Sequence, residues 1–316
     1  GVSYIEAGNP SSNPKDMEFF QEIKKIPLKN STICAFGSTR RKNSTCEQDS
    51  SLQTLLAAQT EVVVIFGKAW PFHVTEIIKT TLEENLLMIK ETCAYLKEQG
   101  KRVFFDAEHC FTAYQENKDY ALKTLQAALD GGAEVLCLCE TKGGSMINQV
   151  QDAVKEVVEL FGKKAQIGIH THNDSGLAVA NSLVAVSEGA THVQGVLLGF
   201  GERTGNANLS TIIPNLQLKM GHECIPEENL AKLTPICKQV AEIANIKLNS
   251  QLPFVGANAF SHKAGMHIDA VLKNPKAYEH ICPDQLGNER KFLMSEVAGR
   301  STIIKKIQKF TKDINF

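Results

Sequence analysis

The sequence predicts a parallel β/α barrel of the TIM (β/α)8 class that lacks its first strand, followed by a small, mainly helical C-terminal subdomain. Short apolar segments alternate with amphipathic helical patterns through about residue 221. The segments are apolar on both faces, which is typical of buried parallel strands. Polar side chains follow nearly every segment. Strand ends of a barrel all meet at one mouth, whereas a doubly wound sheet gathers them at one switch point, so this distribution favours the barrel.

Seven segments rich in valine and isoleucine are expected to form the strands. They are Val2 to Ile5, Ile33 to Phe36, Val62 to Phe66, Val103 to Phe105, Val135 to Leu138, Ile167 to Ile169 and Val193 to Leu198. A closed barrel of this class has about eight strands, and the first segment starts at the second residue. We therefore expect one strand and its helix to be absent from the N-terminal side, which would leave two unpaired apolar edges.

Amphipathic helices are expected between the strands. The clearest begins at Thr75, a residue type that caps helix N-termini, and ends before Gly100, a residue type suited to a left-handed terminator. Apolar residues recur at helical spacing between these two positions. Further helices are expected over Pro14 to Ile26, Tyr120 to Asp130, Ile147 to Phe161, Gly176 to Glu188 and Leu209 to Met220.

The alternation stops after about Gly221, which divides the chain into two domains. We expect residues 1–221 to be the barrel and residues 222–316 to be a smaller subdomain. Pro226 to Ile246 is predicted to be helical with a break at Pro235. Leu252 to Met294 is expected to be irregular, with a helix from about Ser301.

Composition excludes several functional classes. The 316 residues carry a net charge of -1, so no overall field favours nucleic acid or an anionic membrane. No apolar run approaches the roughly 18 residues of a membrane span, and no signal peptide is apparent. The nine cysteines are odd in number and form no C-x-x-C pair, which argues against a disulfide framework and a zinc knuckle. We expect a cytoplasmic protein with reduced thiols.

A pair of histidines follows the sixth apolar segment, in His170-Thr171-His172-Asn173-Asp174. Side chains two residues apart on a strand point the same way, so both imidazoles can reach one ion while Thr171 points away. Divalent transition metals favour neutral imidazole together with oxygen donors. Two hydrogen-bonded histidines in a polar strand end are the alternative, but the polar residues that follow directly favour a metal.

Other polar groups add to the predicted mouth or lie beyond it. Asp106 and Glu108 share a face at one strand end. They are either functional groups of the mouth or a solvated pair of carboxylates, and both alternatives stay open. The glycine-rich loop 199–206 lacks the spacing of a dinucleotide loop and is expected to present Glu202, Arg203 and Asn206 at the mouth. His262 and His267 lie near a glycine in the subdomain. Three alternatives stay open for them: a second metal site, a contribution across an interface, or a place on the surface without a specific role.

Taken together, these motifs resemble the metal-dependent acyl-CoA condensing enzymes, namely the isopropylmalate, homocitrate and citramalate synthases of the HMG-CoA-lyase-like TIM-barrel family. The resemblance spans nearly the whole chain and is strongest over Gly168 to Gly176, Gly199 to Leu209 and Ala259 to His267. Local phrases look most like the citramalate synthase branch. They are Ser12-Asn13-Pro14-Lys15-Asp16, Ala35-Phe36-Gly37-Ser38-Thr39-Arg40, Ile65-Phe66-Gly67-Lys68 and residues 215–221.

The resemblance implies a divalent metal, Zn, Mn or Mg, held by His170, His172 and Asn206. In the family, an Asp on the first strand is a further ligand, and an Arg beside it steadies the ketone oxygen of the substrate. Both belong to a T-L-R-D-G motif that this sequence does not contain.

The resemblance also implies roles for four other residues. Glu108 matches the acid/base position, and Thr141 matches the residue that holds the keto-acid carboxylate. His267 and Tyr278 match catalytic residues of the subdomain that reach an active site, often in the partner subunit of a homodimer.

The implied reaction condenses acetyl-CoA with a 2-oxo acid. In the citramalate branch the 2-oxo acid is pyruvate, and the product serves isoleucine biosynthesis. Two alternatives stay open: a 2-isopropylmalate synthase of leucine biosynthesis, which needs a pocket for a branched 2-oxo acid, and a truncated, non-catalytic relative that acts as a binding or assembly protein.

Three positions depart from the family pattern. The family has Asp-Thr-Asn-Gly where this chain has Glu140, Thr141, Lys142 and Gly143, so a longer acid and a new cation are expected beside the keto-acid site. The family has Asn-Gly where this chain has Leu198 and Gly199, which is expected to weaken hydrogen bonding at the mouth.

Overall fold

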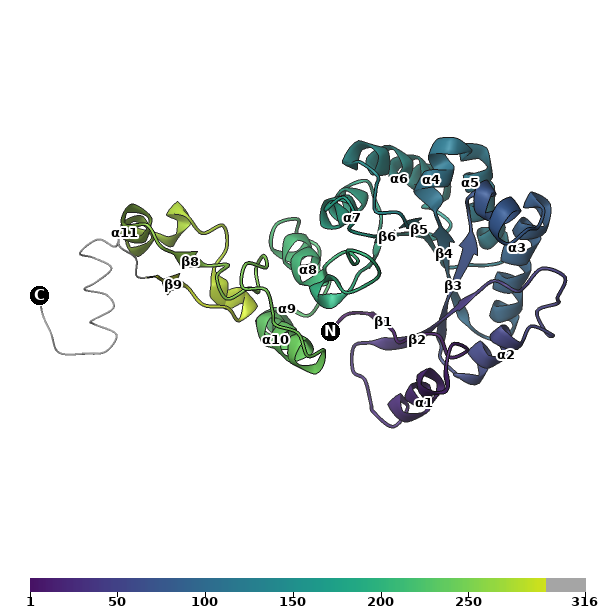
Figure 1. Ribbon diagram of the computed structural model, residues 1–316, viewed down its shortest axis with the longest axis horizontal. Coiled ribbons are helices and arrows are strands. Elements are labelled where there is room, and N and C mark those ends of the chain that lie inside the picture. The colour runs from purple at the N-terminus through teal and green to yellow at the C-terminus, as the bar shows by residue number, and fades with distance from the viewer. Residues whose placement is uncertain (294–316) are drawn as a thin grey trace, which may run out of the picture. The chain divides into compact units, whose positions relative to one another are not determined.

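A computed structural model describes residues 1–293 of the chain, which fall into two compact units. The first unit, Gly1–Asn208, contains a seven-stranded parallel sheet whose strands pair in chain order (Figure 1). All seven predicted strands and their parallel pairing are confirmed. They are β1 (Tyr4–Glu6), β2 (Thr32–Ser38), β3 (Val62–Lys68), β4 (Arg102–Glu108), β5 (Val135–Glu140), β6 (Gln166–Thr171) and β7 (His192–Gln194).

Helices connect these strands and cover the outer side of the sheet (Figure 1). They are α1 (Pro14–Ile23), α2 (Ser50–Ala57), α3 (Leu82–Glu98), α4 (Cys110–Glu116), α5 (Lys118–Asp130), α6 (Ile147–Phe161) and α7 (Ala178–Ser187). A π-helical turn, η1 (His73–Ile77), and a 3-10 turn, η2 (Leu197–Gly199), complete the unit. This is the predicted barrel architecture, with strands inside and helices outside.

Alternate residues of each strand enter two different core layers. Residues such as Ile65 and Leu136 pack with the helices in the larger cluster, and residues such as Val64 and Phe104 form the smaller cluster on the inner face. Tyr4 of β1 lies 5.0 Å from Phe104, and His192 of β7 lies 5.4 Å from it, between ring centroids. The first and last strands therefore curve toward one interior.

Some boundaries differ from those predicted. Thr75 lies inside η1 and is not the N-cap of α3; that residue is Thr81, whose hydroxyl oxygen accepts a hydrogen bond from the backbone N–H of Glu84. The seventh strand ends at Gln194 and does not reach Leu198, because Leu198 is in the left-handed region with φ 64°. Helices α2 and α4 were not predicted; each is a short helix of two turns, too brief for a clear period.

The second unit begins at Leu209 and is mainly helical, as predicted for the subdomain. Its elements are α8 (Leu209–Leu218), α9 (Glu227–Leu230), α10 (Leu233–Ile243), β8 (Ser261–His262), α11 (Gly265–Lys273), η3 (Pro275–Ala277), η4 (Pro283–Leu286) and β9 (Lys291–Phe292). The helical break falls just before Pro235, which lies in the first turn of α10, where proline is tolerated.

The helix predicted from Ser301 lies outside the described residues. Within residues 1–293, no helix is both long and apolar enough to cross a membrane.

Candidate active site at the carboxyl ends of the strands

Strand β6 directs its two histidines into the barrel. A Cβ at Gly168 would lie 3.1 Å from a ring carbon of its neighbour His192 on β7, whose ring packs on the inner-layer Phe104. His170 and His172, the residue after the strand's last, continue the same alternation. Their Nε2 atoms lie 3.4 Å apart. The intervening Thr171 points to the other side, where its hydroxyl contacts α7. The predicted convergence of the two imidazoles is therefore present.

Gln194 of β7 holds the other nitrogen of His170. The Nδ1 atom of His170 lies 2.8 Å from Gln194 Oε1 and donates to it, which leaves Nε2 with a free lone pair. Gln194 Nε2 in turn donates to Asp106 Oδ1 at 2.9 Å. Burial raises the pKa of Asp106 to about 8. Metal-binding histidines commonly have such a partner on the second ring nitrogen.

The glycine-rich loop presents Asn206 to the histidines. Asn206 Nδ2 donates to the Phe200 carbonyl at 2.9 Å, and in the part of the chain that the structure describes its buried Oδ1 atom has no partner of normal hydrogen-bond geometry. A Cβ at Gly201 would lie 2.0 Å from Asn206 Nδ2, and a Cβ at Gly205 would lie 1.9 Å from the Gly199 carbonyl oxygen. Both positions therefore require glycine.

This set of donors fits a divalent transition metal. Two nitrogens bonded to a tetrahedral zinc ion at about 2.1 Å lie about 3.4 Å apart. Burial lowers the pKa of both His170 and His172, which keeps the imidazoles neutral, as ligation requires. The Asn206 side chain acts against the lowering of the His170 pKa, which indicates that the two side chains are neighbours. The amide oxygen of Asn206 is therefore available as a third donor.

Glu108 and Thr141 lie at neighbouring strand ends. Glu108, the last residue of β4, forms an ion pair with Lys68, the last residue of β3. The Thr141 hydroxyl oxygen accepts a hydrogen bond from the backbone N–H of His109 at 2.8 Å, which leaves the hydroxyl proton for another acceptor. Arg203 donates to the Thr141 carbonyl at 2.8 Å and thereby connects the glycine-rich loop to β5.

The two charged departures at the end of β5 and in the loop after it, Glu140 and Lys142, have different surroundings. The Glu140 side chain turns away from the inner face: its buried carboxylate accepts from the Ser145 hydroxyl at 3.1 Å, and burial raises its pKa against the opposing effect of backbone N–H groups of residues 143–145. This follows from the alternation of β5, in which Glu140 shares the outward register of Leu138. Lys142 instead lies over the Trp70 ring, with Nζ 4.0 Å from the centroid.

The remaining two predicted site residues belong to the second unit. His267 on α11 and Tyr278 after η3 are both exposed, and their ring centroids lie 4.2 Å apart. His262 forms a hydrogen bond with Glu279 at 3.1 Å. Within residues 1–293, no group of three close metal-ligating side chains includes His262 or His267, so a second metal site there is not supported.

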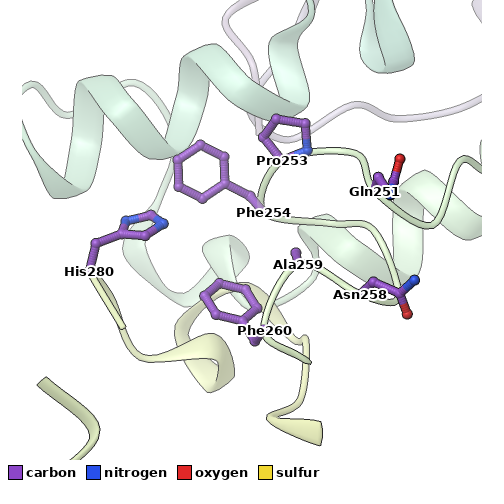
Figure 2. Close-up of a pocket in the computed structure, with 7 residues that line it drawn as sticks. All are labelled: Gln251, Pro253, Phe254, Asn258, Ala259, Phe260 and His280. Atoms are coloured by element: carbon purple, nitrogen blue, oxygen red, sulfur yellow. The ribbon is translucent and has the colours of Figure 1, made fainter. Parts of the chain in front are cut away.

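The second unit also contains a cavity of about 380 Å³. The rings of Phe254, Phe260 and His280 face one another across it (Figure 2). The other lining residues are Gln251, Pro253, Asn258 and Ala259. The lining residues include neither a carboxylate nor any predicted site residue, so the chemistry is assigned to the strand ends instead.

Three side chains near the mouth were missed by the sequence analysis. Gln194 lies two residues after the inward-facing His192, so the period-two alternation of β7 was the signal that could have found it. His109 directly follows Glu108, and His73 lies on η1. No spacing rule links these last two, because they come together only in the folded chain.

Comparison with known protein families gives two matches. Residues 1–241 match the HMGL-like family, and residues 254–315 match the homocitrate synthase post-HMGL domain-like family. An (R)-citramalate synthase of Aquifex aeolicus is 53% identical over 315 residues, which are 100% of this chain and 60% of that protein. A 2-isopropylmalate synthase of Sulfolobus acidocaldarius is 31% identical over 95% of this chain and 74% of that protein.

The chain spans about three-fifths of the length of the citramalate synthases that it matches. Among solved structures, an HMG-CoA lyase of Bacillus subtilis superimposes with a TM-score of 0.64 at 21% identity. The superposition covers 78% of this chain and 83% of that chain. At this identity the likeness concerns the fold alone, and it agrees with the β/α barrel.

Proposed function

Because the chain belongs to the HMGL-like family, we propose that the protein condenses acetyl-CoA with pyruvate to give citramalate. The observation that carries this proposal is the similarity to (R)-citramalate synthases, which extends over the whole chain and exceeds the similarity to a 2-isopropylmalate synthase. The paired imidazoles at the strand ends support the same reaction, because they suit a metal-assisted reaction at a ketone.

His170, His172 and Asn206 are the proposed protein ligands of a Zn, Mn or Mg ion. When bound, this ion supplies Lewis-acid polarisation of the 2-oxo acid ketone. The chain itself holds the ligands in place: Gln194 fixes the ring of His170, and the backbone around Gly201 leaves room for the Asn206 amide.

Proton transfer is assigned to Glu108. Its carboxylate removes a proton from the methyl group of acetyl-CoA, and the enolate carbon then bonds to the ketone carbon of the 2-oxo acid. The ketone C=O double bond becomes a single bond in this step, and its oxygen takes up a proton to give the product hydroxyl. The Lys68 ammonium beside Glu108 keeps the carboxylate oriented. Thr141 has a hydroxyl proton free to donate to the substrate carboxylate. Water then cleaves the thioester and releases CoA.

The remaining assignments concern the whole protein. We assign residues 1–221 to the barrel domain and residues 222–316 to the subdomain. His267 and Tyr278 are exposed on their unit, which suits a catalytic contribution to an active site, including that of a partner subunit in a homodimer. A cytoplasmic location is proposed because the nine cysteines are all free thiols. No nucleic-acid or membrane partner is proposed.

The test measures CoA release by the full-length, metal-loaded protein with pyruvate and with a branched 2-oxo acid. The proposal predicts that pyruvate gives the higher kcat/KM, that His170→Ala abolishes release, and that Glu108→Gln lowers kcat by about 100-fold or more. The exposed His222→Gln is the matched control. Preference for the branched acid would favour the 2-isopropylmalate reaction. If neither 2-oxo acid leads to CoA release, the protein is a non-catalytic relative.

A further inference from the structure

A second cluster of metal-ligating side chains lies beside the proposed catalytic carboxylate. His73, Glu108 and His109 each offer one ligand atom, and these three atoms lie within 4.8 Å of one another. The residues come from η1, the end of β4 and the residue that follows β4. None of them belongs to the His170, His172 and Asn206 set.

The two imidazoles of this cluster are held by ring contacts, and one nitrogen of each has no hydrogen-bond partner within the described residues. Only 8% of His109 is exposed, and its Nδ1 atom, like that of His73, is buried with no hydrogen-bond partner among residues 1–293. The two ring centroids lie 4.3 Å apart, and each lies 5.3 Å from the Trp70 ring. His109 has a left-handed backbone with φ 61° immediately before α4.

Unpartnered buried ring nitrogens are costly unless something binds them. Two imidazoles and one carboxylate form a donor set that zinc uses in proteins. Donor atoms around a tetrahedral zinc ion lie about 3.4 Å apart, so closing this cluster requires side-chain movements of roughly 1 Å. Both imidazoles also have pKa values lowered by burial, so they are neutral at neutral pH, as ligation requires.

We propose that His73, Glu108 and His109 form a second site for a transition-metal cation of the zinc class. The competitor at this site is Lys68, which is already paired with Glu108. A bound cation therefore takes the Glu108 carboxylate away from Lys68 and from proton transfer, so excess Zn²⁺ inhibits the enzyme. The inhibition rests on the proposed function of Glu108, whereas the binding site does not.

The test is equilibrium dialysis of the full-length protein against buffered Zn²⁺, with bound zinc counted by mass spectrometry. Four proteins are compared: wild type, His170→Ala, His73→Gln and the double variant. We expect about two, one, one and no equivalents, respectively, with His109→Gln behaving like His73→Gln. The exposed histidine variant His222→Gln is the control and should retain both equivalents. His109→Gln replaces His73→Gln if the latter does not fold.

The same variants separate the site from the function. With activity assayed as CoA release, His73→Gln should raise the Zn²⁺ concentration for half-inhibition by about 10-fold or more. The reason is that removing one protein ligand lowers the affinity of a metal site by at least this factor. Equal zinc content in His73→Gln, His109→Gln and wild type would overturn the proposed site. If His73→Gln and His109→Gln lose the expected zinc equivalent but wild type releases no CoA, the proposed site stands and the proposed function is rejected.

Discussion

A single imidazole becomes a defined metal ligand only when its second nitrogen is held. In His170 this is done by Gln194, whose amide oxygen accepts from Nδ1 and whose amide nitrogen donates to Asp106. The chain Asp106, Gln194, His170 therefore fixes both the tautomer and the ring direction. Asp106 is buried, so this support is protected from solvent.

Substitution of Gln194 tests whether its hydrogen bonds support the His170 ring. Gln194→Leu keeps the side-chain volume but removes both hydrogen bonds, so the affinity of the His170 and His172 site for zinc should fall by about 10- to 100-fold. Calorimetric titration of the metal-free protein measures this. Gln151→Leu, which loses only an exposed hydrogen bond, is the control. Unchanged affinity in Gln194→Leu would show that Gln194 does not orient the ligand.

At the residue scale, the sequence predicted the inward pairs but not their support. The period of two within a strand was enough to direct His170 with His172, and Asp106 with Glu108, to one side. Gln194 was missed because its contact with His170 depends on the pairing of β7 with β6 in the folded sheet. Glu140 was wrongly expected beside the mouth because the expected strand ended at Leu138, so the alternation that turns Glu140 outward was not extended to it.

At the element scale, the glycine-rich loop is the segment that the site depends on most. Its backbone turns at Gly199, Gly201 and Gly205, all with positive φ, and two of these positions leave no room for a Cβ. The loop therefore positions Asn206 by backbone geometry.

Gly201→Ala tests this directly. The added methyl group would overlap the Asn206 amide, so Asn206 must move and metal affinity should fall by about 10-fold or more. Gly144→Ala is the matched control, because a Cβ there meets nothing within 4 Å. Both variants are compared by zinc titration. If they retain equal affinity, Asn206 is not a ligand.

Leu198 stores backbone strain at the start of this loop. A bulky residue in the left-handed region, with φ 64°, costs about 1–3 kcal/mol, whereas asparagine tolerates this region. We predict that Leu198→Asn raises the free energy of unfolding by about 1 kcal/mol in urea titration. Leu198→Ala keeps the strain and loses the side chain, so it should be less stable than wild type. A destabilised Leu198→Asn would contradict this interpretation.

The elements themselves were predictable where their period was long. Helix α6 begins and ends at the predicted residues, Ile147 and Phe161, because four turns give a clear apolar face. The start of α3 was missed, although Thr81 and Glu84 have the spacing of a capping box. The preceding π-helical turn continued the apolar pattern of α3 and hid this signal.

At the scale of the whole molecule, the barrel followed from one regularity, the alternation of buried strands with amphipathic helices. The two paired imidazoles were found because they lie on one strand. The His73, Glu108 and His109 cluster was not predictable, because its members come from separate elements that only the fold brings together.

We infer that His170 and His172 bind one metal ion at the barrel mouth. Anomalous diffraction at the zinc edge, from crystals of the full-length protein grown with Zn²⁺, tests it most directly. We predict a peak about 2.0–2.1 Å from Nε2 of both histidines, and its disappearance in His170→Ala. A zinc-loaded, active protein with no peak within bonding distance of these two nitrogens would contradict the claim.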